Sequence, residues 1–143
     1  MRLSVFTDYG LRALMRIAAD PTRPHSTAEI ADSFGISRHH LTKAVTALAN
    51  AGILTTRRGH EGGAQLARPA HDIRLGEVIR LLEQGSALVE CFQSDGGACR
   101  ISPDCRLKGF LAEGREAFLA AMDHQTLADC TLPPFAAVAG ERA

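Results

Sequence analysis

The sequence has no net charge and no apolar run long enough to cross a bilayer. Its 143 residues carry 16 Lys and Arg against 16 Asp and Glu, and the mean hydropathy is −0.03. Hydrophobic residues make up 45% and charged residues 22%, which excludes a disordered chain and is typical of one globular domain with its own core. No apolar signal region follows Met1–Ser4, so we expect a soluble, cytoplasmic protein without a membrane partner.

Recognisable enzyme motifs are also lacking. No nucleophile lies beside a matching base, and no carboxylate pair occurs in a convincing context. Residues 59–63 (GHEGG) are rich in glycine, but they do not have the strand-to-helix setting of a phosphate-binding loop. We therefore expect that the protein is not an enzyme.

The zero net charge conceals an uneven distribution. Residues 1–70 carry nine Lys and Arg against five Asp and Glu, whereas residues 71–143 carry seven against eleven. The excess is largest over residues 37–68, where five Lys and Arg stand against Glu61 alone. A basic face in the first half of the chain indicates a nucleic-acid partner.

Three helices are predicted in the basic half. Residues 6–19 have helical apolar spacing, with Asp8 in the first turn. The segment 26–29 (STAE) has the spacing of a capping box, and the helix behind it ends at Gly35 in a left-handed turn. Ser37 then caps a third helix that ends near residues 50–52. Two short helices joined by a glycine turn indicate a helix-turn-helix.

Two short strands, at residues 53–56 and 65–67, flank the basic, glycine-rich segment 57–63. A hairpin directly after a helix-turn-helix indicates a winged helix. The expected fold class is therefore mainly α, with a winged helix-turn-helix DNA-binding domain over residues 1–70. Residues 71–143 are expected to hold a connecting helix at 75–83, a cysteine-bearing loop at about 85–105, a long amphipathic helix at about 105–127 and a flexible tail.

The candidate DNA contacts lie on the third helix and on the hairpin tip. The N-terminal half of a recognition helix meets base edges, so Arg38 is suited to guanine, while Lys43 is suited to phosphate. Arginines at a wing tip are suited to the minor groove. A solvated helix beside a charged loop would explain each residue singly, but not the order of caps, turn and hairpin. The candidates are Ser37, Arg38, His39, His40, Thr42, Lys43, Arg57, Arg58, Gly59 and His60.

Cys91, Cys99 and Cys105 fall within fifteen residues of one loop. In a cytosolic protein such a group indicates metal binding or redox chemistry rather than a resting disulfide. Structural zinc sites pair ligands two to four residues apart, whereas iron–sulfur clusters tolerate wider spacing. Reactive thiols, zinc and unligated cysteines stay open as alternatives. The spacing does not choose a fourth ligand between Cys130 and His124, and Cys130 is expected to pack as a small hydrophobe.

Several of these segments together resemble a known family. The segment 6–14 (FTDYGLRAL), the helix at 26–36 and the three-cysteine loop resemble the winged-helix iron–sulfur transcriptional regulators, the family that contains IscR. Residues 89–92 (VECF), 105–108 (CRLK) and 126–129 (TLAD) resemble the nitric-oxide-sensing NsrR branch of that family. The resemblance extends from residue 1 to about residue 130.

The resemblance implies a homodimeric repressor that binds double-stranded operator DNA, with residues 105–127 as the dimerisation helix. It implies one [4Fe–4S] cluster per subunit, whose nitrosylation by nitric oxide releases the operator and derepresses nitric-oxide detoxification genes. It assigns Cys91, Cys99 and Cys105 as ligands, with Asp8 of the other subunit as the fourth. Lys108 stands where IscR-like members carry a histidine, which disfavours an IscR-type cluster site, and a [2Fe–2S] cluster stays open as the less favoured type. A thiol switch, in which two of the three cysteines form a disulfide, is the alternative.

Overall fold

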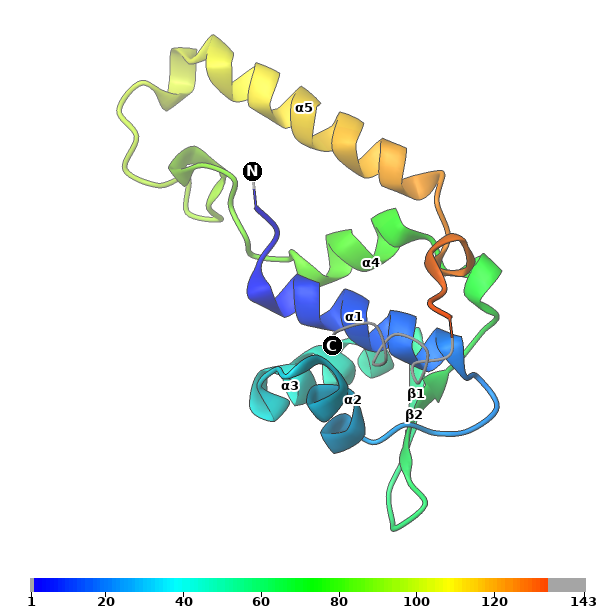
Figure 1. Cartoon of the computed structure of the whole chain (residues 1–143). Helices are drawn as coiled ribbons and strands as arrows, with labels where there is room; N and C mark the ends of the chain where they lie inside the picture. The colour runs from blue at the N-terminus through cyan, green and yellow to red at the C-terminus, as the bar shows by residue number, and fades with distance from the viewer. Residues whose placement is uncertain (1, 134–143) are drawn as a thin grey trace, which may run out of the picture.

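The computed structural model describes residues 2–133, so most of the expected flexible tail lies outside the described residues. A winged helix occupies one end of the molecule, and a long helix runs along the other (Figure 1). The helices and strands are α1 (Val5–Ala19), α2 (Thr27–Phe34), α3 (Arg38–Asn50), β1 (Leu54–Arg57), β2 (Gly63–Leu66), α4 (Leu75–Leu82) and α5 (Arg106–Asp123). Short 3-10 turns are η1 (Ala70–Asp72), η2 (Glu90–Phe92), η3 (Ser102–Asp104) and η4 (Leu127–Cys130). The mainly α, winged-helix expectation is confirmed.

Serine hydroxyls begin all three helices of the DNA-binding half. Ser4 and Ser26 each accept the backbone N–H three residues on, at 3.1 Å, and Ser37 does the same at 3.4 Å. Each bond satisfies one of the N–H groups that a helix start leaves without an internal partner. The predicted helix starts are therefore correct to within one or two residues.

Gly35 makes the turn of the helix-turn-helix. Its φ of 62° is left-handed, and the Ile36 N–H then donates back to the Ala31 carbonyl at 3.1 Å, which closes α2. A side chain at Gly35 would meet open space, so glycine is needed here for its backbone conformation alone.

The wing is an antiparallel pair in which Leu54 faces Leu66 and Arg57 faces Gly63. His25 forms an isolated antiparallel bridge to β2, because its N–H and carbonyl exchange hydrogen bonds with Ala64 at 3.0 and 2.8 Å. A Cβ at Gly63 would lie 2.6 Å from the His25 carbonyl, so this close approach also requires glycine. The base of the wing is thus fixed to the segment that leads into α2.

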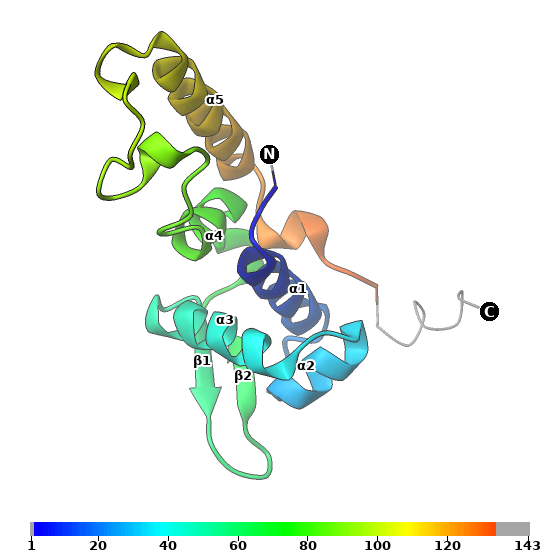
Figure 2. The same cartoon turned by 90° about the vertical axis from the view of Figure 1, so that its left-hand side faces the viewer.

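One continuous core joins both halves of the chain. It includes buried residues of α1, α2 and α3 together with Ile73, Val78, Leu82 and Leu127 from the second half. α4 lies against α1, with α3 on the opposite side of α1 (Figures 1 and 2). The predicted division near residue 70 therefore does not coincide with a division of the core.

α5 lies apart from that core. Leu119 is its one buried residue within the described chain, and Leu107 and Phe110 are 60% and 59% exposed. Its C-terminal end is held to α4, because Arg80 makes two bonds of 2.7 Å to the Asp123 carboxylate. Among residues 2–133, no helix combines the length and the apolar character that crossing a membrane requires.

Two boundaries differ from the sequence expectation. α5 ends at Asp123 rather than near 127, because Leu127 is fully buried and its N–H donates to the Ile73 carbonyl at 2.8 Å, which turns the chain back to the core. The cysteine-bearing loop expected at about 85–105 contains two short helical turns, η2 and η3. Helical spacing alone does not show where a tertiary contact ends a helix.

Replacing Gly35 by Ala should lower the free energy of unfolding by about 1–2 kcal/mol, because an L side chain is strained at this φ even though space is available. Gly35→Asn is the matched control and should lose less, since asparagine tolerates the left-handed region. Urea unfolding followed by circular dichroism measures both. Equal stability of the alanine variant and the wild type would contradict the left-handed backbone conformation of Gly35.

Candidate functional site

α3 and the wing form the candidate DNA-binding surface. All ten residues proposed for DNA contact are exposed, and they belong to two elements that lie side by side at one end of the molecule (Figure 2). The structure therefore leaves the whole predicted set accessible to DNA.

The arginine and lysine side chains among these candidates form no ion pairs with other described residues. Within residues 2–133, Arg38, Lys43, Arg57 and Arg58 form no salt bridge. Unpaired cations on an exposed helix and wing are available to neutralise phosphates and release counterions. The Thr42 hydroxyl, by contrast, already donates to the Arg38 carbonyl at 2.8 Å, so what it can offer DNA is its methyl group and oxygen lone pairs.

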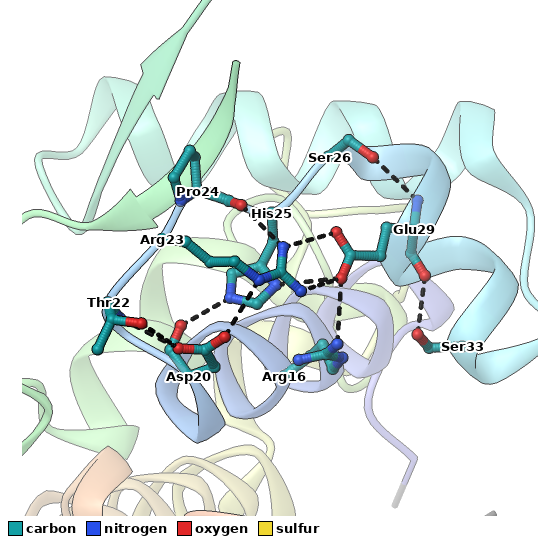
Figure 3. Close-up of polar contacts among 9 residues, drawn as sticks. All are labelled: Arg16, Asp20, Thr22, Arg23, Pro24, His25, Ser26, Glu29 and Ser33. Atoms are coloured by element: carbon teal, nitrogen blue, oxygen red, sulfur yellow. Dashed lines mark hydrogen bonds and ion pairs between the residues drawn. The ribbon is translucent and has the colours of Figure 1, made fainter. Parts of the chain in front are cut away.

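A polar cluster between α1, α2 and the wing fixes the orientation of this surface (Figure 3). Glu29, in the first turn of α2, accepts hydrogen bonds from Arg16 of α1 and from Arg23 of the connecting loop, each at 3.1 Å. His25 is fully buried, and its Nε2 lies 2.7 Å from the Asp20 carbonyl. Because His25 also bridges to Ala64, the cluster holds the end of α1, the start of α2 and the base of the wing together.

The Glu29 carboxylate departs from the predicted capping box. The pattern 26–29 would direct it back to the Ser26 backbone, but it binds the two arginines instead. The hydrogen bond from Arg23 is the largest influence on the pKa of Glu29, and with the nearby positive charges it outweighs burial and holds that pKa below its ordinary value of 4.5. The Glu29 carboxylate therefore makes tertiary ion pairs with Arg16 and Arg23 in place of the local bond to the Ser26 backbone.

The cysteine loop joins α4 to α5 and is closed by short-range hydrogen bonds. The Glu90 carboxylate accepts the Ala98 N–H at 2.9 Å, and the Asp95 carboxylate accepts the Gly97 N–H at 2.9 Å. Gly97 has a φ of 63°, and a Cβ there would lie 2.5 Å from the Glu90 carbonyl. These contacts fold residues 90–98 back on themselves, which places Cys91 and Cys99 at the two ends of one closed turn.

All three loop thiols are free and half-buried. Cys91 belongs to η2, Cys99 follows the closed turn, and Cys105 is the residue from which α5 begins. Thiolate sulfur is the soft donor that iron–sulfur clusters require, so the donor set fits such a group. Within residues 2–133, however, no three His, Cys, Asp or Glu side chains are close enough to hold a metal ion.

Asp8 and Cys130 are also placed. Asp8 is in the first turn of α1, and its carboxylate pairs with Arg12 at 2.9 Å. Cys130 packs against the core, and its thiol donates to the Leu127 carbonyl at 3.3 Å. Burial, helped by the charge of Asp129, raises the pKa of the Cys130 thiol, so it is protonated near neutral pH. It behaves as the small hydrophobe that the sequence suggested.

Comparison with known proteins now decides the family. The sequence profile of the Rrf2 family, described as iron-dependent transcriptional regulators, matches residues 3–131. The chain belongs to the Rrf2 family. Rrf2 proteins are DNA-binding transcriptional regulators rather than enzymes, which agrees with the exposed helix-turn-helix and wing.

Solved Rrf2-like structures share this fold over nearly the whole chain. CymR (YrzC), the global cysteine regulator of B. subtilis, is 28% identical, with 90% of this chain and 95% of that chain covered and a TM-score of 0.69. IscR of T. potens is 29% identical, with 90% and 85% covered and a TM-score of 0.70. An oxidized form of CymR from Staphylococcus aureus is 30% identical, with 89% and 93% covered and a TM-score of 0.67.

Two groups of residues in this Rrf2 chain escaped the sequence reasoning. The cluster around His25 and Glu29 arises from tertiary pairing, and its residues look like ordinary loop and cap residues. The second is Glu83, at the C-terminal end of the connecting helix, whose carboxylate accepts hydrogen bonds from Ser4 and Thr7 at the start of α1. The one sequence signal for it is an acidic residue at the C-terminal end of a helix, where the helix dipole disfavours negative charge.

Substituting Glu29 by Gln should lower the free energy of unfolding at pH 7 by about 1–2 kcal/mol, because two arginines lose a charged acceptor. The pKa of Glu29 is lowered by folding, so its contribution is complete above its ordinary value of 4.5 and is lost as the pH falls through the lower folded-state value. The stability difference between the two proteins should therefore shrink on acidification from pH 6 to pH 3.

Glu61→Gln, at the exposed wing tip, is the control for loss of one carboxylate, and its free energy of unfolding at pH 7 should equal that of the wild type. Urea titrations at each pH provide the measurement. A Glu29→Gln difference that stays constant with pH would show that the carboxylate charge contributes nothing.

Proposed function

We propose that this Rrf2 regulator is a homodimeric repressor that senses nitric oxide through a [4Fe–4S] cluster held by Cys91, Cys99, Cys105 and Asp8, as in the NsrR branch. The observation that carries the proposal is the group of three free, half-buried thiols on one loop that leaves α4 directly beside α1. This loop is the part of the chain that combines soft donors with a connection to the DNA-binding half.

The proposed ligands differ in hardness. Cys91, Cys99 and Cys105 would hold three irons through soft sulfur, whereas Asp8 of the other subunit would offer a hard carboxylate oxygen. A bound cluster would supply reactivity toward nitric oxide, and the iron held by the Asp8 oxygen would be the one whose ligand exchanges most easily. Asp8 has an alternative partner in its own subunit, because Arg12 pairs with it in the single chain.

The dimer is proposed from the exposed apolar residues of α5. Leu107 and Phe110 are more than half exposed, although both are large and apolar. A second copy of α5 packed on this face would remove them from water and would place two α3 helices at a fixed separation. A palindromic operator with matching half-site spacing is the DNA that such a dimer fits.

A thiol-based switch is the second candidate. The S. aureus CymR structure is described as an oxidized form, and that chain is 30% identical to this one. The half-exposed loop cysteines are accessible enough for oxidation of two of them to a disulfide. A [2Fe–2S] cluster on the same cysteines is the other variant of the proposal. Both alternatives would keep the DNA-binding repressor and replace the [4Fe–4S] cluster as the sensor.

Protein purified without oxygen should contain about four iron and four sulfide ions per chain. Its affinity for a duplex selected from a random DNA pool should fall after exposure to nitric oxide. Asp8→Ala should change the visible spectrum and the rate of reaction with nitric oxide, while Asp32→Ala, an exposed acidic residue of α2, should change neither. Iron and sulfide assays, absorbance and gel-shift titration provide the measurements.

A colourless protein that contains zinc would refute the [4Fe–4S] assignment. A protein that contains two iron and two sulfide ions per chain would refute it as well. Absence of both metal and sulfide, together with reversible thiol oxidation that releases DNA, would favour the thiol switch.

Arg38→Ala should weaken binding to the selected duplex by about 1–3 kcal/mol and relax the preference at one base pair, as expected for a side chain that contacts guanine. Lys43→Ala should weaken selected and unrelated duplexes equally and reduce the salt dependence, as expected for a phosphate contact. The unrelated duplex is the control. Unchanged affinity of both variants would move the DNA-reading surface away from α3.

A further inference from the structure

Glu83 joins the start of the cysteine loop to the start of α1. It follows the last residue of α4, and its Oε1 accepts hydrogen bonds from the backbone N–H and the hydroxyl of Ser4, both at 2.8 Å. The same oxygen also accepts from the hydroxyl of Thr7, which is fully buried. These partners are 76 to 79 residues away in sequence, so the contact is tertiary rather than a local cap.

The negative charge of Glu83 interacts favourably with the dipole of α1 and unfavourably with the dipole of its own helix, α4. A carboxylate at the C-terminal end of α4 opposes the dipole of that helix, but the same carboxylate lies at the N-terminus of α1, where negative charge is favoured. Burial raises the pKa of Glu83, yet hydrogen bonds from Thr7, Ser4 and Ser86 outweigh it and hold the pKa below its ordinary value. The group is therefore ionised near neutral pH.

The first turn of α1 receives this contact, and that turn carries Asp8. The Ser4 carbonyl accepts the Asp8 N–H at 3.0 Å, so the residue bound by Glu83 also closes the turn on which the proposed ligand lies. A change in the direction of the loop at Glu83 would therefore act on the position of Asp8.

α1 then continues to the recognition helix. A Cβ at Gly10 would overlap Leu82 of α4 and would lie 3.7 Å from the Cβ of Ala44 in α3. α1 is thus in close contact with the residue beside Glu83 on one side and with α3 on the other. Close-packed contacts of this kind transmit small displacements, because no empty space absorbs them.

We propose that Glu83 is the positioning residue that couples the cysteine loop to α3, by holding the first turn of α1 against the end of α4. This inference rests on the proposed function, in which the occupancy of the loop sets the affinity for DNA. The loop begins at Glu83, and through Ser4 and Thr7 its state reaches the turn that carries Asp8 and the helix that supports α3.

The test compares the operator dissociation constants of the metal-free and the metal-loaded dimer, as a ratio, for the wild type, Glu83→Gln and Thr7→Val. Glu83→Gln removes the charge, whereas Thr7→Val removes one donor with nearly the same buried volume. Each substitution should reduce the ratio by about tenfold, while the iron and sulfide content per chain stays as in the wild type. A general loss of stability affects both forms and does not produce this change.

Glu77→Gln is the matched control, because Glu77 is an exposed carboxylate of the same helix that pairs with Arg68. It should keep the wild-type ratio. If Glu83→Gln does not fold, Thr7→Val decides the question alone. Variants that keep the full wild-type ratio would overturn the role of Glu83 and leave the proposed sensor intact, whereas a wild-type ratio of one would refute the sensor itself.

Discussion

The contact at Gly10 fixes the position of the recognition helix relative to the rest of the molecule. A Cβ at Gly10 would overlap the Leu82 side chain of α4, and it would lie in ordinary contact, at 3.7 Å, with the Cβ of Ala44 in α3. The helix that carries most of the candidate DNA contacts is therefore packed against α1 rather than attached to a flexible arm. Its position follows that of α1, and the position of α1 follows that of α4.

Two polar arrangements act at opposite ends of α1. At its N-terminal end, Glu83 brings a carboxylate from α4 to the helix start. At its C-terminal end, Arg16 binds Glu29 of α2, and the adjoining loop brings His25 to the wing. One end of α1 thus faces the cysteine loop, and the other end faces the elements proposed to touch DNA. A single rigid helix of 15 residues connects the two regions.

Local patterns were enough to predict the DNA-binding half from sequence. Serine caps, the left-handed Gly35 and a glycine-rich hairpin tip each act over a few residues, and each appears in the structure where the pattern predicted it. The loop cysteines and the ten candidate DNA contacts were chosen from residue type and spacing, and their roles stay predictions. Contacts between distant segments were not predictable in this way. α5 ends before Leu127 because Leu127 is buried in the core, away from the axis of α5. Glu83 contacts residues nearly eighty positions away in the sequence. Neither partner leaves a periodic signal in the sequence.

The attachment of α5 at one end has a mechanical consequence. The helix has 18 residues, a length of about 27 Å, and its buried and ion-paired residues, Leu119 and Asp123, lie in its final turns. Cys105 stands at the opposite tip, where the cysteine loop joins it. A small tilt about the clamped end therefore becomes a displacement of several ångströms at the sulfur-bearing tip. Conversely, a displacement of the Cys105 end of α5 is transmitted through its attached end to α4, whose last turn packs directly against α1.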